Sequence, residues 1–69
     1  FMSGLELYEL RKELGITQSD LAKHLGYYSN GIPNRSMIAR FENGHASINS
    51  RIAMLINQYA KECKEIADA

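Results

Sequence analysis

The residues of this sequence that are best suited to bind a ligand lie in the segment 35–42. Its apolar residues Met37, Ile38 and Phe41 fall on one face of a helix, and the opposite face has cationic or short side chains and no acid before Glu42. The outward positions are Arg35, Ser36, Ala39 and Arg40. Guanidinium and hydroxyl groups can donate hydrogen bonds to base edges, and a helix with such a face fits the major groove of DNA. The segment therefore predicts a helix that reads double-stranded DNA.

A second short helix is expected over Gln18–Leu25, where it would support the first. Thr17 and Asp20 have the spacing of a capping box, which satisfies two backbone N–H groups at a helix start. Gly26 stands where a left-handed C-cap is usual. The apolar face of this helix consists of Leu21, Ala22 and Leu25. Two such helices joined by a turn form a helix-turn-helix, here with a stretched turn.

Helices on either side of this pair are expected to complete the core. The first runs from about Ser3 to Leu14 and begins with a capping box. The helix that reads DNA should span Arg35–Asn43 with Asn34 as its N-cap, and the last helix should span about residues 50–66, capped by Asn49 or Ser50. The apolar stripe of the last helix is Ile52, Leu55, Ile56, Tyr59, Cys63 and Ile66. Because no strand-like alternation appears, residues 1–69 are predicted to form one all-α domain, a compact bundle of four or five helices with a central helix-turn-helix.

The charge of the chain is neutral overall but unevenly distributed. Eight Lys and Arg balance eight Asp and Glu. Between Leu21 and Ala60, however, Glu42 is the single acid beside four cations. These cations are Lys23, Arg35, Arg40 and Arg51. A basic middle with acidic ends permits DNA binding but predicts weak non-specific affinity.

Several other classes of protein are disfavoured by the composition. The longest fully apolar run, 52–56, is too short to cross a membrane, and no signal peptide is visible. Met2 is expected to be the initiator, with one added residue before it. A single cysteine, Cys63, and two histidines give no metal-ligand spacing, so Cys63 is expected to be a small buried apolar residue. We therefore expect a cytoplasmic protein with no metal, no other cofactor and no membrane partner.

No set of residues supports catalysis. A Ser/His/Asp constellation, paired carboxylates, a P-loop or a dinucleotide fingerprint cannot be assembled from this sequence. His24 lies among polar residues of a helix and His45 lies in a loop, and both are expected at the surface. No catalytic residue is predicted.

Three segments taken together resemble the Cro/CI-type (XRE) helix-turn-helix family of phage and bacterial repressors. They are LRKELGITQ at 10–18, LA followed by LG at 21–26, and I-x-x-FENG at 38–44. The resemblance covers about residues 5–57, with one departure: Ala22 and Ile38 lie sixteen residues apart, six more than in the family. The extra residues fall within 27–34, where Tyr27 is expected in the core. Tyr28, Ser29 and Asn30 can contact phosphates or a partner subunit, and the sequence leaves both open.

The resemblance implies which residues contact DNA. Arg35, Ser36 and Arg40 match base-reading positions, and Ala39 would meet a thymine methyl or permit close approach. For Arg35 the alternative is a phosphate contact, and Arg40 is equally suited to either role. Phosphate contacts are implied for Gln18, at a helix N-terminus, and for the loop after the reading helix, with plain surface as the alternative. The candidates are Gln18, Asn34, His45, Ser47, Asn49 and Arg51, and capping alone is the simpler interpretation of Asn34.

Two structural contacts are also expected. The family often pairs an Arg of the first helix with the Glu that ends the reading helix, which implies an ion pair between Arg11 and Glu42, strong if buried and weak if exposed. The stripe of the last helix extends past the core at Tyr59, Cys63 and Ile66, where a two-fold interface is expected. The alternative is that this stripe packs wholly within one monomer.

These features predict a sequence-specific DNA-binding transcription regulator, a repressor or autoregulator that acts as a homodimer on an inverted repeat. The alternative is a protein-interaction module, such as the antitoxin of a toxin–antitoxin pair, which the zero net charge leaves open. RNA binding is less favoured, because no sheet with exposed aromatic residues is expected. A chain this short leaves no room for a separate ligand domain, so no small-molecule effector is expected.

Overall fold

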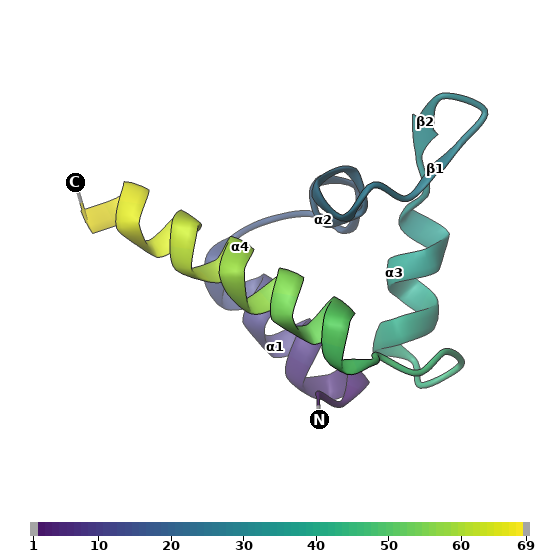
Figure 1. The fold of residues 1–69 in the computed structure, drawn as a ribbon, viewed down its shortest axis with the longest axis horizontal. Helices are drawn as coiled ribbons and strands as arrows, with labels where there is room; N and C mark the ends of the chain where they lie inside the picture. Colours follow the sequence, from purple (N-terminus) through teal and green to yellow (C-terminus); the bar gives the residue numbers. More distant parts are fainter. Residues whose placement is uncertain (1, 69) are drawn as a thin grey trace.

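The described part of the chain folds into four helices and a short β-hairpin (Figure 1). The computed structural model describes residues 2–68, with side chains through residue 65. The elements are α1 (Gly4–Leu14), α2 (Gln18–Leu25), β1 (Tyr28–Ser29), β2 (Ile32–Pro33), α3 (Arg35–Glu42) and α4 (Ser50–Asp68). The predicted helical bundle with a central helix-turn-helix is confirmed. None of these helices has the length and apolarity needed to cross a bilayer.

The starts of α1 and α2 are fixed by side chains. Ser3 Oγ accepts a hydrogen bond from the backbone N–H of Glu6 at 3.1 Å, and Thr17 Oγ1 accepts one from that of Asp20 at 3.0 Å. Each acid accepts in return from the backbone N–H of its cap, so both capping boxes are complete. The hydrogen bond from the Thr17 backbone lowers the pKa of the Asp20 carboxyl. The stability that this hydrogen bond contributes to the folded state is therefore present above the unfolded-state pKa of Asp20. It is lost as the pH falls through the folded-state pKa.

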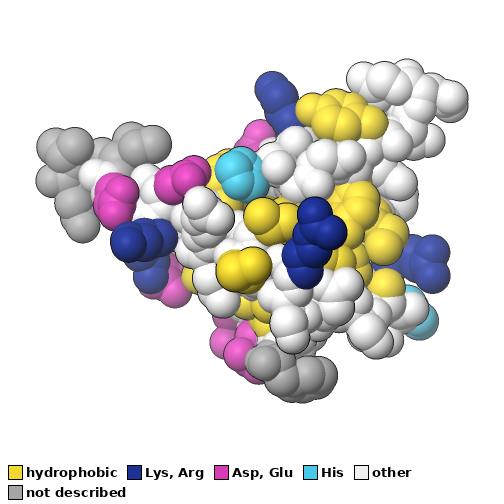
Figure 2. All heavy atoms as spheres, in the orientation of Figure 1, with side chains coloured by type: hydrophobic (Ala, Val, Ile, Leu, Met, Phe, Trp, Pro, Cys, Tyr) yellow, Lys and Arg dark blue, Asp and Glu magenta, His cyan; other side chains and the backbone are white. Residues whose placement is uncertain are grey.

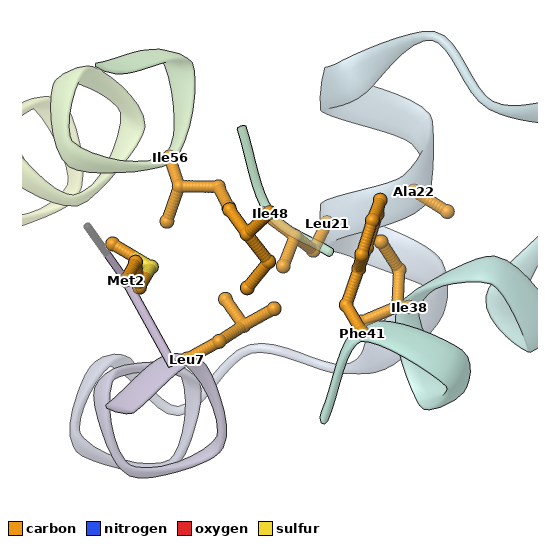
Figure 3. Packing of buried hydrophobic residues seen from close by; sticks show 8 residues of the cluster. All are labelled: Met2, Leu7, Leu21, Ala22, Ile38, Phe41, Ile48 and Ile56. Atoms are coloured by element: carbon orange, nitrogen blue, oxygen red, sulfur yellow. The ribbon is translucent and has the colours of Figure 1, made fainter. Parts of the chain in front are cut away.

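The core forms where the four helices meet (Figure 3). Leu7 of α1, Leu21 of α2 and Phe41 of α3 are almost fully buried, and Ile56 of α4 packs with them. The buried cluster is Met2, Leu7, Leu21, Ala22, Ile38, Phe41, Ile48 and Ile56. Removing this apolar surface from water is the main favourable contribution in a domain this small. The core thereby decides which face of α3 remains in solvent.

The stretched turn contains a β-hairpin, which the all-α prediction did not include. The strands are antiparallel, with Tyr28 opposite Pro33 and Ser29 opposite Ile32. Between them Asn30 and Gly31 have φ angles of 53° and 77°. Two successive positive φ angles are typical of a type I′ turn, for which Asn-Gly is a preferred dipeptide. Each strand is only two residues long, so it has no alternation for a hydrophobic pattern to reveal.

Asn34 occupies the N-cap position of α3, but the prediction that its side chain caps the helix is wrong, because it makes no capping hydrogen bond. Its ψ angle is 80°, whereas the two residues that do cap, Ser3 and Thr17, have ψ angles of 162° and 166°. The backbone N–H of Asn34 donates to the Tyr27 carbonyl at 2.8 Å, which closes the base of the hairpin. The hairpin therefore sets the ψ angle of Asn34 at the start of α3. This angle differs from the ψ angle at which Ser3 and Thr17 cap their helices.

The start of α1 lies directly against the end of α3, at Gly4. A Cβ atom added there would lie 2.5 Å from the carbonyl oxygen of Glu42 and closer still to that of Phe41. Backbone carbonyls cannot yield as a flexible side chain can, so this position requires glycine.

We expect Gly4→Ala to destabilise the fold by about 1–3 kcal/mol, because overpacking would force α1 away from α3. In thermal unfolding followed by circular dichroism, Tm should fall by roughly 4 to 20 °C for a domain of this size. Glu9→Ala, at an exposed position of the same helix, is the control and should leave Tm nearly unchanged. Since Ala ordinarily stabilises a helix relative to Gly, a rise in Tm for Gly4→Ala would contradict the close packing.

Candidate nucleic-acid interface

Helix α3 has one buried face and one open face. Ile38 and Phe41 are 0% and 1% exposed, and the Tyr27 ring packs against Phe41 with ring centroids 6.0 Å apart. The opposite face carries the four predicted base-reading residues: Arg35, Ser36 and Arg40 are exposed, and Ala39 is half-buried. We call these four residues the recognition ridge. The ridge combines two guanidinium groups and a hydroxyl with a small residue that permits close approach.

The only acid of α3, Glu42, points into the protein and is paired there. Arg11 Nε donates to Glu42 Oε2 at 2.7 Å and Arg11 Nη2 donates to Oε1 at 3.3 Å, with side chains only 9% and 6% exposed. The same guanidinium donates through Nη1 to the Ile16 carbonyl at 3.1 Å. The structure thus brings together the two residues of the expected ion pair. It also places the one negative charge of α3 away from the recognition ridge.

Gln18, the expected phosphate contact at the start of α2, joins this pair. Its side-chain Nε2 donates to Glu42 Oε1 at 3.1 Å, and the residue is half-buried. The three side chains of Arg11, Glu42 and Gln18 therefore connect α1, α3 and α2. Nothing in the sequence indicated this hydrogen bond, because the two residues are 24 positions apart and lie on different helices.

Helix α2 packs across the inner side of α3 and leaves the ridge facing outward. Leu21 and Ala22 of α2 are 1% and 0% exposed. On the face drawn in Figure 2, the surface over α3 on the right is mostly hydrophobic and uncharged, with Lys or Arg and His side chains at its edges and no Asp or Glu among them. Acidic side chains gather instead toward the C-terminal part of α4 on the left and near the N-terminus. The surface around α3 is therefore suited to a polyanion although the chain is neutral.

A family model described as helix-turn-helix matches residues 7–61, which include most of α1, all of α2, the hairpin and α3, and the first part of α4. The chain belongs to the XRE-type helix-turn-helix family. The resemblance to Cro/CI-type domains is thus confirmed. This is a family of DNA-binding regulators, not typically of enzymes, and DNA binding in transcription regulation is accordingly the function of this domain. Comparison with curated proteins and with solved structures gave no match.

In this XRE-type domain the loop after α3 folds back onto the helix. The backbone N–H of His45 donates to the Arg40 carbonyl at 2.8 Å. Four of the expected phosphate-contacting residues are exposed in this loop and at the start of α4: His45, Ser47, Asn49 and Arg51. Asn49 has a structural role, because its Oδ1 accepts from the Ile52 backbone N–H at 2.8 Å and so caps α4. The loop thus lies beside the C-terminal end of the recognition ridge.

The three residues expected at a subunit interface have different surroundings. Tyr59 is half-buried and packs against the core, and its ring stacks on the exposed His24 with centroids 3.9 Å apart. Burial raises the pKa of the Tyr59 hydroxyl, and the neighbouring Cys63 adds to the shift. Cys63, one turn later, is a half-buried free thiol. The side chain of Ile66 lies outside the described residues. Tyr59 therefore already has packing partners within the monomer.

Sequence reasoning missed the hairpin as a structural element next to the ridge. It exposes two large side chains, Tyr28 at 50% and Ile32 at 66%. The dipeptide Asn30-Gly31 is the signal that could have found it, since Asn-Gly strongly favours a two-residue hairpin turn.

We expect Glu42→Ala to cost about 3–5 kcal/mol, because it would leave the Arg11 guanidinium buried without a counter-charge. For a domain of this size the fall in Tm should exceed about 10 °C. Glu13→Ala is the matched control, since the Glu13–Lys64 pair spans 3.6 Å with side chains 66% and 56% exposed. An exposed pair contributes little, so Tm of this control should barely change. If Glu42→Ala matched the control, the buried network would not be important for the fold.

Proposed function

We propose that this protein is a sequence-specific repressor or autoregulator that binds its operator as a homodimer. The observation that carries the proposal is the recognition ridge, which is open to solvent on a helix whose own acid is paired in the interior. A helix that entered a major groove with an outward acid would meet phosphates of the same sign. Here the interior position of Glu42 avoids that repulsion.

The ridge supplies the base contacts in this proposal. Arg35 lies in the first turn of α3 and can donate two hydrogen bonds to O6 and N7 of a guanine, a contact that discriminates by about 1–3 kcal/mol. Ser36 can donate or accept. Ala39 allows the backbone to approach a thymine methyl, and Arg40, one turn later, reaches a base or a phosphate. Specificity thus rests mainly on the start of α3.

Phosphate contacts on either side of the ridge would fix its register. On one side we propose Gln18 at the start of α2, where backbone N–H groups and the helix dipole favour an anion. On the other side we propose the loop that folds back on α3. The full set of proposed phosphate contacts is Gln18, Asn34, His45, Ser47, Asn49 and Arg51.

A homodimer would compensate for the small number of cations in one domain. Two copies double the phosphate contacts and place two copies of α3 in successive major grooves about 34 Å apart, over an inverted repeat. The supporting feature is α4, which extends past α1 and α2 (Figure 1) and exposes Leu55 at 37% on the same side of the helix as Tyr59. We propose that the contact centres on Tyr59, Cys63 and Ile66. Repression would then follow from occlusion of the promoter.

Mobility-shift titrations should show that Arg35→Ala weakens binding to the DNA upstream of the protein's own gene by roughly tenfold or more, which corresponds to the loss of one bidentate base contact. Binding to random DNA should fall much less. Lys61→Ala removes one exposed positive charge from α4 and is the matched control, which should leave both affinities nearly unchanged. An equal loss on specific and random DNA would contradict base recognition by Arg35. Lack of preference of the intact protein for any duplex would favour a protein-interaction module instead.

We expect Cys63→Asp to weaken self-association, because it would place a charge in an apolar contact between subunits. Sedimentation velocity over a concentration series should show the monomer–dimer midpoint rising by at least about tenfold. Lys61→Ala again serves as the control, since it alters the exposed side of the same helix. A dimer that persists unchanged in Cys63→Asp, with Tm preserved, would show that the subunits meet elsewhere.

A further inference from the structure

The β1–β2 hairpin leads directly into α3, with no linker between the two elements. β2 ends at Pro33, Asn34 is the N-cap, and Arg35 is the first residue of α3. Figure 1 shows the hairpin projecting beyond the N-terminal end of α3, away from α1 and α4. By strand geometry the ribbon adds about 10 Å to a helix that is about 12 Å long. The hairpin therefore nearly doubles the reach of the element that carries the ridge.

Both helices of the helix-turn-helix hold the hairpin in place. The backbone N–H of Tyr27 donates to the Ala22 carbonyl in α2 at 2.9 Å, and the Tyr27 ring packs against Phe41 of α3. At the other strand, the backbone N–H of Asn34 donates a hydrogen bond to the Tyr27 carbonyl at 2.8 Å. The base of the hairpin is thus fixed relative to the ridge.

The hairpin has one face beside α2 and one open face. Residues opposite each other on paired strands share a face. Tyr28 lines a shallow pocket with Lys23 and His24 of α2, and its partner Pro33 is half-buried. Ser29 and Ile32 form the other face, and both are exposed, Ile32 by 66%. No residue from 26 to 34 is charged, so the ribbon can approach a phosphate backbone without repulsion.

We infer that the open face of the hairpin enters the same major groove as α3 and contacts the base pairs next to those that the ridge reads. This inference rests on the proposed function. The major groove admits a two-stranded ribbon as well as a helix. The Ser29 hydroxyl can donate or accept at a base edge. Ile32 offers an apolar side chain, for which the matching group in the groove is the thymine methyl. The half-site is accordingly longer than α3 alone can read.

Selection of duplexes from a random DNA pool tests the inference, with the intact protein and two single variants. In Ile32→Ala the open face loses its apolar group, and because the residue is exposed the fold should survive, as Tm will verify. Leu5→Ala is the matched control, since Leu5 is 64% exposed on α1, away from the hairpin. The intact protein and the control should select a core and a thymine-containing flank outside it. Ile32→Ala should select the same core with no preference for thymine in the flank.

A second measurement isolates the methyl group. Replacing the flanking thymine of the selected duplex by deoxyuridine removes only the 5-methyl. Affinity of the intact protein should fall about fourfold, the equivalent of one methyl no longer removed from water. Affinity of Ile32→Ala should be the same for both duplexes.

Two results would overturn the inference while leaving the proposed function intact, because the core would still be selected. One is an identical flank preference in Ile32→Ala and the intact protein. The other is a loss of both the flank preference and dimerisation in Ile32→Ala, the latter by sedimentation velocity, which would assign the open face to a partner subunit and not to the groove. Failure of the intact protein to select any core would instead contradict the proposed function and the inference with it.

Discussion

The orientation of α3 depends on the burial of Glu42 against Arg11. A buried carboxylate is costly unless charge and hydrogen bonds compensate it, and here three donors from Arg11 and Gln18 converge on its two oxygens. These donors come from α1 and α2, so the end of α3 is tied to both neighbouring helices at one point. The same end meets the start of α1, where the absence of a side chain at Gly4 permits backbone contact. Any rotation of α3 that turned Glu42 outward would break the ion pair and open this contact.

The other end of α3 is held by the hairpin, which explains how the motif tolerates an enlarged turn. Extra residues between two packed helices would loosen their angle if they formed a flexible loop. In this domain Tyr27 remains attached to the end of α2 through its hydrogen bond to Ala22 and packs, half-buried, against Phe41 of the core. The hairpin then returns the chain to Asn34, adjacent to Tyr27. The insertion is therefore accommodated beyond the helix pair, and the contact between α2 and α3 is kept.

The helices could be predicted from the sequence because their signals are local. Capping boxes at Ser3 and Thr17 and apolar residues at helical spacing define α1 and α2 within a turn of chain. The hairpin was not predicted, because two-residue strands are too short to show an alternating hydrophobic pattern. Only the Asn-Gly dipeptide marks it. The missing cap at Asn34 follows from that error, since the hairpin fixes a backbone angle that the sequence alone does not report.

The residues of the candidate site likewise include some that the sequence could predict and some that it could not. The outward face of α3 could be predicted from periodicity, because burial of Ile38 and Phe41 leaves few choices for the residues between them. The Arg11–Glu42 pair could be expected only from resemblance to a family, since nothing local links residues 31 positions apart. The hydrogen bond between Gln18 and Glu42 was indicated neither by a local pattern nor by the family resemblance. Contacts between side chains on different helices depend on how those helices pack, and that information is spread over the whole core.

The neutral charge of the chain bears on how such a protein would discriminate between DNA sequences. Non-specific binding depends on the number of phosphates neutralised, and this chain places few cations near α3. Weak attraction to every duplex lowers the background against which an operator must be found. Under the proposed function, affinity for the operator would then have to come from contacts that depend on base sequence and from the pairing of two subunits. An uncharged hairpin that lengthens the reading surface fits this requirement, because it adds base contacts without adding attraction to DNA in general.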